Sequence, residues 1–283
     1  MVVVDRKSNK KYEYKSSGFV SFLYNNFIGR FILKLLCNRF IANFVALFMN
    51  SSLSRFMIKR KIKSAEIDMS LYENKKYKCF NEFFTRKLVN ISFDDNKNSF
   101  ISPCDSKLLI LKLDKNLKFN IKGSSYNAFE VIENDIVKDF YNGYVLVFRL
   151  DVNDYHHYCY VDDGYRDGFH YIKGILHTVQ PIVYDKVNVF HRNCREWCVL
   201  HTNNFSDIIQ CEIGAMLVGK ICNDQNVIEF NKGDEKGHFE FGGSTVVLFV
   251  KENVVDFDKD IMNNSKVGRE TIVKYGEKIG IKK

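Results

Sequence analysis

Glycine is distributed unevenly along this chain, and its distribution separates two parts that we expect to form different secondary structure. Residues 1–100 contain only Gly18 and Gly29, whereas 14 of the 16 glycines lie in 101–283. Apolar residues in the first part recur at helical spacing, for example through 27–36. From residue 108 onward, short runs rich in Val, Ile, Phe and Tyr alternate with turn residues, at 144–150, 174–179, 198–201 and 246–250. The pattern predicts an α+β fold, with helices first and a mainly antiparallel β-sandwich or barrel body after them.

The N-terminal region, which we place at 1–75, combines aromatic and basic side chains. Seven phenylalanines lie between residues 19 and 48, and five Lys or Arg residues follow within 55–63. The longest uncharged piece, 40–54, has 15 residues, which is too short to span a bilayer. We therefore expect amphipathic, membrane-associating helices that lie in the membrane interface near anionic headgroups. A helical subdomain packed on the core is the alternative. Because no nucleic-acid-binding module accompanies the charge, we expect no nucleic acid partner.

The cysteines predict neither disulfides nor a metal site. The eight cysteines contain no CxxC pair, and the closest two, Cys194 and Cys198, have no histidines arranged as in a zinc module. The N-terminus does not resemble a cleavable signal peptide. We therefore expect free thiols in a reducing cytoplasm and no structural metal.

The tetrapeptide 242–245 (GGST) separates the alternating stretch 236–241 from the apolar run 246–250. Two glycines permit a turn geometry that most residues forbid. Ser244 Oγ could attack the preceding carbonyl, that of Gly243, which would close a five-membered ring and convert the peptide into an ester. This step needs a strained peptide, a base for the hydroxyl and hydrogen-bond donors for the oxyanion. Elimination would then release residues 1–243 as a carboxylate and leave a dehydroalanine, which hydrolyses with loss of ammonia to a pyruvoyl group at position 244. Its carbonyl can form a Schiff base with an amine and act as an electron sink for decarboxylation. A tight strand connection is the alternative for so short a motif.

Six further segments carry a family resemblance, in one order along the chain: 80–88 (FNEFFTRKL), 102–108 (SPCDSKL), 154–164 (DYHHYCYVDDG), 214–221 (GAMLVGKI), 232–245 (KGDEKGHFEFGGST) and 270–280 (ETIVKYGEKIG). Together they resemble the phosphatidylserine decarboxylase proenzymes, particularly the bacterial forms cleaved at GGST. The resemblance runs from about residue 69 to the C-terminus. It implies that 76–283 is the catalytic domain and that the chain cleaves itself into 1–243 and a pyruvoyl-bearing chain of 283 − 243 = 40 residues.

The resemblance also implies a cleavage triad of Asp, His and Ser. Asp105 follows Pro103 as in the family's PxDG acid motif, although Ser106 replaces the glycine. The segment DYHHYC is similar to the family's DYHRxH, so His156 corresponds to the histidine associated with decarboxylation. Cys159 stands where the family has its second histidine, the expected base for cleavage.

Three groups are therefore candidates for the base that activates Ser244. Cys159 would need a thiolate, and a thiol with a pKa of roughly 8.5 needs help from its surroundings. His157 replaces the family's arginine and lies next to His156. His177 lies in GILHTVQP, which is similar to the family's GxLxSVNP, and we expect it on a neighbouring strand. We hypothesise that His177 takes the proton.

The expected activity is decarboxylation of phosphatidylserine to phosphatidylethanolamine and CO2, with the covalent pyruvoyl group derived from Ser244 as cofactor and no metal. Expected partners are phosphatidylserine in an anionic membrane surface and the chain's own cleaved small chain. We expect a peripheral protein at the cytoplasmic face of the cell membrane. Whether it forms a homodimer stays open. Arg86 and Lys87 are candidates for headgroup contact. Two other functions remain open: a pyruvoyl-dependent decarboxylase of another amine, and a lipid-binding relic that no longer matures, motivated by Cys159 and Ser106.

Overall fold

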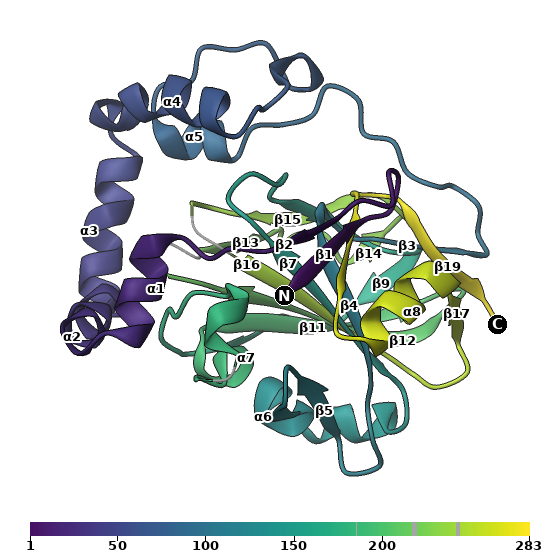
Figure 1. Ribbon diagram of the computed structural model, residues 1–283. Coiled ribbons are helices and arrows are strands. Elements are labelled where there is room, and N and C mark those ends of the chain that lie inside the picture. The colour runs from purple at the N-terminus through teal and green to yellow at the C-terminus, as the bar shows by residue number, and fades with distance from the viewer. Residues whose placement is uncertain (185, 217–219, 242–243) are drawn as a thin grey trace.

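An 11-stranded sheet forms the centre of the molecule (Figure 1). The computed structural model describes residues 1–184, 186–216, 220–241 and 244–283, so Gly242 and Gly243 lie outside the described residues. The path of the sheet runs through β14 (Glu229–Phe230), β9 (Gly164–Arg166), β11 (Arg195–Thr202), β12 (Ser206–Gly214), β16 (Ser244–Val250), β7 (Tyr144–Leu150), β4 (Ser106–Lys112), β18 (Glu270–Val273), β1 (Val2–Asp5) and β2 (Lys11–Glu13), with β10 (His170–Ile172) beside β11. Every described pair in this sheet is antiparallel except β1 with β18.

Both faces of the central strands are covered, which explains why their sequences are apolar without a break. All seven residues of β16 are buried. Val247 and Phe249 join one hydrophobic cluster, while Val246 and Leu248 join another. Successive side chains of a strand point to opposite faces, so these two clusters lie on the two sides of the sheet.

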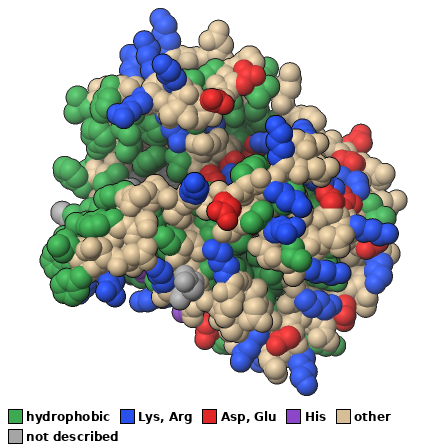
Figure 2. Space-filling model, in the orientation of Figure 1, with side chains coloured by type: hydrophobic (Ala, Val, Ile, Leu, Met, Phe, Trp, Pro, Cys, Tyr) green, Lys and Arg blue, Asp and Glu red, His purple; other side chains and the backbone are tan. Residues whose placement is uncertain are grey.

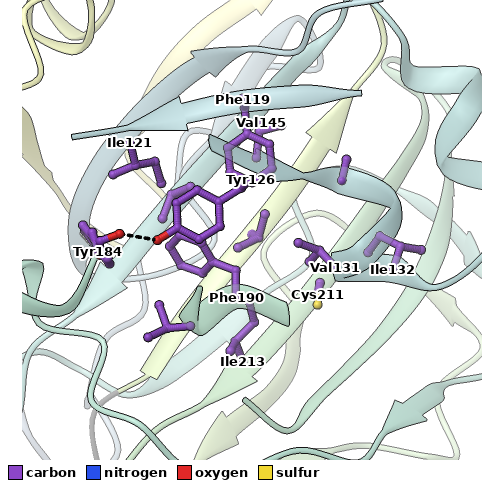
Figure 3. Packing of buried hydrophobic residues seen from close by; sticks show 14 of the residues in the cluster. Phe119, Ile121, Tyr126, Val131, Ile132, Val145, Tyr184, Phe190, Cys211 and Ile213 are labelled. Atoms are coloured by element: carbon purple, nitrogen blue, oxygen red, sulfur yellow. Dashed lines mark hydrogen bonds between the residues drawn. The ribbon is translucent and has the colours of Figure 1, made fainter. Parts of the chain in front are cut away.

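The first cluster is covered by helices and a small hairpin. Figure 3 shows Tyr126 packed between Phe119 and Phe190, with its hydroxyl donating to the Tyr184 carbonyl at 3.2 Å. The covering elements here are β5 (Lys118–Ile121), β6 (Ser124–Asn127), α6 (Ala128–Ile132), η3 (Asp135–Phe140), η4 (Pro181–Val183) and α7 (Val189–Arg192).

The second cluster is covered by two three-stranded sheets and a helix. These are β13–β15–β8 (Ile221–Asn223, Glu235–Phe239, His157–Cys159), β17–β19–β3 (Val255–Phe257, Lys278–Lys282, Ser99–Ile101) and α8 (Lys259–Lys266). The layered arrangement agrees with the predicted α+β class and its mainly antiparallel strands. The described strands of the main sheet follow an open path, so they do not form a closed barrel.

Short helices make up most of the N-terminal region, as the apolar spacing predicts. They are α1 (Gly18–Asn25), α2 (Phe27–Leu36), α3 (Arg39–Met49), η1 (Ser52–Arg55), α4 (Phe56–Ser64), η2 (Met69–Leu71) and α5 (Phe80–Phe84). Asn26 is extended and its side chain accepts from Ile28 N, which ends α1 and begins α2. The backbones of α1 and α2 then cross so closely that a Cβ on Gly29 would lie 2.1 Å from the Phe22 carbonyl oxygen.

Two features of the fold differ from the expectation. The chain begins with β1, which pairs with β18 near the C-terminus, so residues 2–13 belong to the main sheet rather than to the helices. The apolar run 174–179 forms only a single bridge, at Ile175, and His177 therefore lies in irregular backbone instead of on a strand. Within the described residues, no single helix is long and apolar enough to cross a bilayer; α1 and α2 meet that test only as a pair bent by 104°.

Candidate functional site

Ser244 lies at the start of a strand in the middle of the main sheet. It is the first residue of β16 and pairs with Leu150 of β7 on one side and Gly214 of β12 on the other. The side chain is fully buried, and its Oγ has no hydrogen-bond partner among the described residues. A buried hydroxyl without a partner costs roughly 1–3 kcal/mol, so this position holds a free hydroxyl at a cost in stability.

The loop that carries His156 starts beside Ser244. Leu150, at the end of β7, pairs with Ser244. Six residues later, the carbonyl of His156 accepts from the amide of Phe239 at 3.0 Å. The loop 150–156 is therefore joined to the Ser244 strand at its first residue and to β15 at its last.

The His156 imidazole is neutral and has a free lone pair. Its Nδ1 lies 2.8 Å from the Asp154 carbonyl, which can only accept, so Nδ1 carries the proton and Nε2 the lone pair. Nε2 is buried and has no partner among the described residues. Burial lowers the pKa of His156 to about 3, with a further contribution from the Arg86 charge. Such an imidazole is a base that stays unprotonated throughout the neutral range.

Buried ion pairs hold the 151–156 loop against the sheet. Arg149 binds Glu270 through two contacts of 2.8 and 2.6 Å, and its third contact, 2.7 Å, is to Asp151. Lys107 binds Asp154 at 2.6 Å. With both acidic residues of the loop paired to cations on β4 and β7, the His156 backbone is fixed at both ends of its loop.

Asp105 is close to the position of the family's second histidine but is bonded elsewhere. Its two carboxylate oxygens accept from Lys274 Nζ at 2.7 Å and from the Tyr275 amide at 2.9 Å. Two residues earlier, the Pro103 carbonyl accepts from the Cys159 amide at 2.9 Å. The structure thus brings the 103–105 segment to Cys159, while the hydrogen-bonding partners of Asp105 among the described residues are these two groups rather than an imidazole.

Cys159 has a neutral thiol. The side chain is fully buried, and its Sγ lies 4.0 Å from the Ser102 carbonyl. Burial raises the pKa of Cys159 to about 12. A thiolate is therefore scarce at neutral pH, which disfavours Cys159 as the base that activates Ser244.

Both ring nitrogens of His157 are already engaged. Nδ1 lies 2.8 Å from Glu235 Oε1, and Nε2 lies 3.2 Å from the Thr85 carbonyl. The ring is stacked between Tyr155 and His238. These contacts leave no free lone pair for Ser244.

His177 is linked to Ser244 through a buried asparagine. The side chain of Asn193 donates to the carbonyls of His177 and Gly214, both at 2.8 Å, and Gly214 pairs with Ser244. The imidazole itself faces the N-terminal helices, with Nδ1 3.0 Å from the Tyr24 hydroxyl of α1. Burial lowers the pKa of His177 to about 4, so this ring is also neutral. Its backbone, rather than its ring, is the part tied to the strand opposite Ser244.

Three residues on or next to α5 complete the site and were not assigned these contacts from the sequence. Asn81 Oδ1 accepts from the Phe241 amide at 2.9 Å, just before the GGST sequence. The Phe84 ring lies 4.0 Å from the His156 ring and 5.4 Å from that of Phe241. Arg86 is buried, and its Nη2 lies 3.4 Å from the Asn153 carbonyl in the His156 loop. The only signal for these contacts in the sequence was that all three residues lie within the segment FNEFFTRKL.

Comparison with known proteins gives one consistent result. Residues 80–281 match the family described as phosphatidylserine decarboxylase. Phosphatidylserine decarboxylase proenzyme 2 of Clostridium acetobutylicum is 47% identical, over 95% of this chain and 93% of that protein. The phosphatidylserine decarboxylase proenzymes of Clostridium botulinum strain Hall and Clostridium tetani are 40% and 39% identical, over the full length of this chain and 100% and 99% of theirs.

Proposed function

The chain belongs to the phosphatidylserine decarboxylase family, and we propose that it converts phosphatidylserine to phosphatidylethanolamine and CO2 after cleaving itself between Gly243 and Ser244. The observation that carries the proposal is the Ser244 hydroxyl, which is buried at the start of β16 and has no partner among the described residues. A group left unsatisfied in a buried position calls for a functional explanation. Here that explanation is attack on the preceding peptide.

The surroundings of Ser244 fit the covalent pyruvoyl group that the family implies. When formed from Ser244, the group supplies a carbonyl that binds the substrate amine and takes up the electrons left by departing CO2. Seven residue pairs join β16 to β12, and seven join it to β7. The 40-residue chain 244–283 would therefore stay in the sheet after cleavage and remain a partner of the large chain.

His156 is our candidate for the group that takes the Ser244 proton. Its Nε2 is a buried acceptor and Ser244 Oγ a buried donor, and neither has a partner within the part of the chain that the structure describes. The Phe84 ring packs against both the His156 ring and that of Phe241, which lies three residues before Ser244. His177, which the sequence favours, is better suited to positioning, because its backbone bonds to Asn193 support the Gly214 strand. After cleavage, His156 Nε2 is also available to move a proton at the reacting carbon.

Arg86 is suited to holding an acidic group of the substrate. Its guanidinium is buried between the rings of Tyr72 and Phe83, and no carboxylate among the described residues is ion-paired with it. The Nε atom of Arg86 also has no hydrogen-bond partner among the described residues. Buried charges are normally paired, so a substrate phosphate or carboxylate would complete this site.

The N-terminal helices offer a surface for the lipid. Among the described residues from α1 to α4, eight apolar side chains are each more than half exposed: Phe19, Phe27, Ile28, Phe31, Phe44, Leu47, Leu53 and Phe56. Figure 2 shows hydrophobic side chains gathered on the left of the molecule, over α1 to α3, with Lys and Arg side chains above them near α4. Exposed apolar side chains beside basic ones suit an anionic membrane surface. The eight cysteines, which contain no CxxC pair, suit the reducing cytoplasmic side of the cell membrane.

Mass spectrometry and chemical trapping test the proposal together. The purified chain should give two species divided at 243/244, and borohydride added with phosphatidylserine should attach the lipid to 244–283. Ser244→Ala should stay intact, whereas Ser265→Ala, which removes another buried serine hydroxyl, should be cleaved normally. A single uncleaved species of 33.1 kDa after long incubation would favour the non-maturing relic. Trapping with a soluble amino acid but not with phosphatidylserine would favour the other amine decarboxylase.

A further inference from the structure

A cluster of three ionisable side chains lies beside the candidate site and has no part in the proposed reaction. His157 comes from β8, and Glu235 and His238 come from the adjacent strand β15. One ligand atom from each of the three lies within 4.8 Å of the other two. His157 is fully buried, while the other two are partly exposed.

A β-bulge is what brings the two β15 residues to the same side. Residues three apart on a regular strand point to opposite faces, so Glu235 and His238 would normally diverge. The register shifts between Glu235 and Gly237, which adds one residue and turns Glu235 toward the His238 face. His238 lies directly opposite His157, and their rings stack at 4.9 Å.

The contacts of His157 leave a place for a proton or a cation between Nδ1 and Glu235. Nε2 faces the Thr85 carbonyl and Nδ1 faces Glu235 Oε1. The Thr85 carbonyl can only accept, so Nε2–H donates to it. The Nδ1 lone pair then faces a carboxylate oxygen, and a cation held between the two would satisfy both.

The donor atoms of the other two residues face the same point as His157 Nδ1. His238 Nδ1 lies 3.8 Å from Glu235 Oε1, and the His238 ring stacks on that of His157. Lys87 lies 3.5 Å from Glu235 Oε2, which leaves Oε1 directed at the histidines.

We propose that His157, Glu235 and His238 bind one divalent transition-metal ion of the zinc class. Two imidazoles and one carboxylate are a donor set that such ions prefer. A tetrahedral ion with bonds of 2.0–2.1 Å needs donors about 3.3 Å apart. Glu235 Oε1 lies 2.8 Å from His157 Nδ1 and 3.8 Å from His238 Nδ1, which brackets that value.

The surroundings support the same site. The Thr85 carbonyl fixes the His157 tautomer from behind, as carbonyls commonly do for histidines that bind metals. On the open side, a hollow of about 420 Å³ is lined by residues that include Lys87, Glu235 and His238, which leaves room for a water as fourth ligand. The ion would join β8 to β15 next to His156, and would therefore stabilise the strand that follows the candidate base.

Metal analysis of matched variants tests the site. The chain, purified without a polyhistidine tag, should hold about one zinc per molecule and, after exchange, one Co²⁺ with visible absorption bands of a nitrogen and oxygen site. Glu235→Gln and His238→Asn should each weaken binding at least ~10-fold. His201→Gln is the control, because His201 also lies between two carboxylates, Asp207 and Asp167, but on opposite ring nitrogens. It should bind metal as the unchanged chain does.

The same experiment separates the site from binding to thiols. Zinc should raise the melting temperature of the unchanged chain and of His201→Gln, but not that of His238→Asn. Binding that survives in both Glu235→Gln and His238→Asn would locate the ion elsewhere and overturn the proposal. So would an unchanged chain that holds no more metal than His238→Asn, because the cluster would then be an imidazolium–carboxylate pair.

Discussion

The buried, neutral imidazoles of the site predict that self-cleavage is insensitive to mild acid. An ordinary histidine with a pKa of about 6.5 is only ~3% neutral at pH 5, so a base of that kind would slow cleavage about thirty-fold between pH 8 and pH 5. The pKa of His156 is lowered to about 3 by burial. At pH 5 its ring is then about 99% neutral, and the cleavage rate should change by less than about two-fold.

The assay follows the two chains from freshly synthesised precursor. Cell-free translation into buffers from pH 5 to pH 8, with samples stopped in denaturant and resolved on a gel, gives the rate at which 1–243 and 244–283 appear. A thirty-fold loss at pH 5 would refute the neutral base. His156→Ala should abolish cleavage, and His177→Ala should slow it without stopping it. Complete cleavage of His156→Ala would instead make His177 the candidate, as its sequence segment suggested.

The stability of the precursor must be measured in the same buffers, because the burial of His156 lowers the free energy of unfolding in acid. The folded pKa of His156 lies below its unfolded value, so its contribution to stability is present above about pH 6.5 and is lost as the pH falls toward 3. At pH 5 the loss is about 2 kcal/mol, from roughly 1.5 pH units at about 1.4 kcal/mol each. Circular dichroism at each pH shows whether the precursor is folded, and only rates from folded samples test the base.

Three further predictions concern the parts that support the site. Arg149→Met leaves Glu270 buried without its cation, so it should lower the free energy of unfolding by about 3–5 kcal/mol in urea titrations, and adding Glu270→Gln should recover part of the loss. Gly29→Ala places a Cβ against the Phe22 carbonyl and should cost about 1–3 kcal/mol; an unchanged urea midpoint would contradict the close crossing of α1 and α2. Phe31→Ser removes an exposed apolar ring and should weaken binding to phosphatidylserine vesicles by about 2 kcal/mol in sedimentation assays while stability stays the same.

Local patterns in the sequence were enough to predict the main elements of the fold. The run 144–150 is β7, and 246–250 falls within β16, because continuous apolar segments of this length form strands buried on both faces. The strand at Val2–Asp5 could not be predicted in the same way. Its partner is β18, more than 260 residues away in the chain, and only tertiary contact decides that pairing. The strand predicted at 174–179 does not form, because the Asn193 side chain binds the backbone N–H and carbonyl of His177 in place of a neighbouring strand.

Motif spacing indicated which residues gather at the site but not their protonation or their partners. The 103–105 segment meets Cys159, and the loop that carries His156 starts at Leu150, which pairs with Ser244. Burial, which the sequence does not state, sets the pKa of two of these groups. It makes Cys159 a neutral thiol and His156 a neutral base. The pairing of Asp105 with Lys274 is a tertiary contact that the motif does not indicate either.

These protonation states bear on how a member of this family can mature with cysteine in place of its second histidine. A thiol that remains protonated cannot take the Ser244 proton, and an Asp105 carboxylate paired with Lys274 has no imidazole to orient. The acceptor must then come from a group whose lone pair is already free. Among the described residues, His156 Nε2 is a buried ring nitrogen without a partner, and the Asp154 carbonyl holds its tautomer as a positioned base requires. One histidine would thus serve first in cleavage and later in decarboxylation, which is feasible because the two reactions occur one after the other at the same residue.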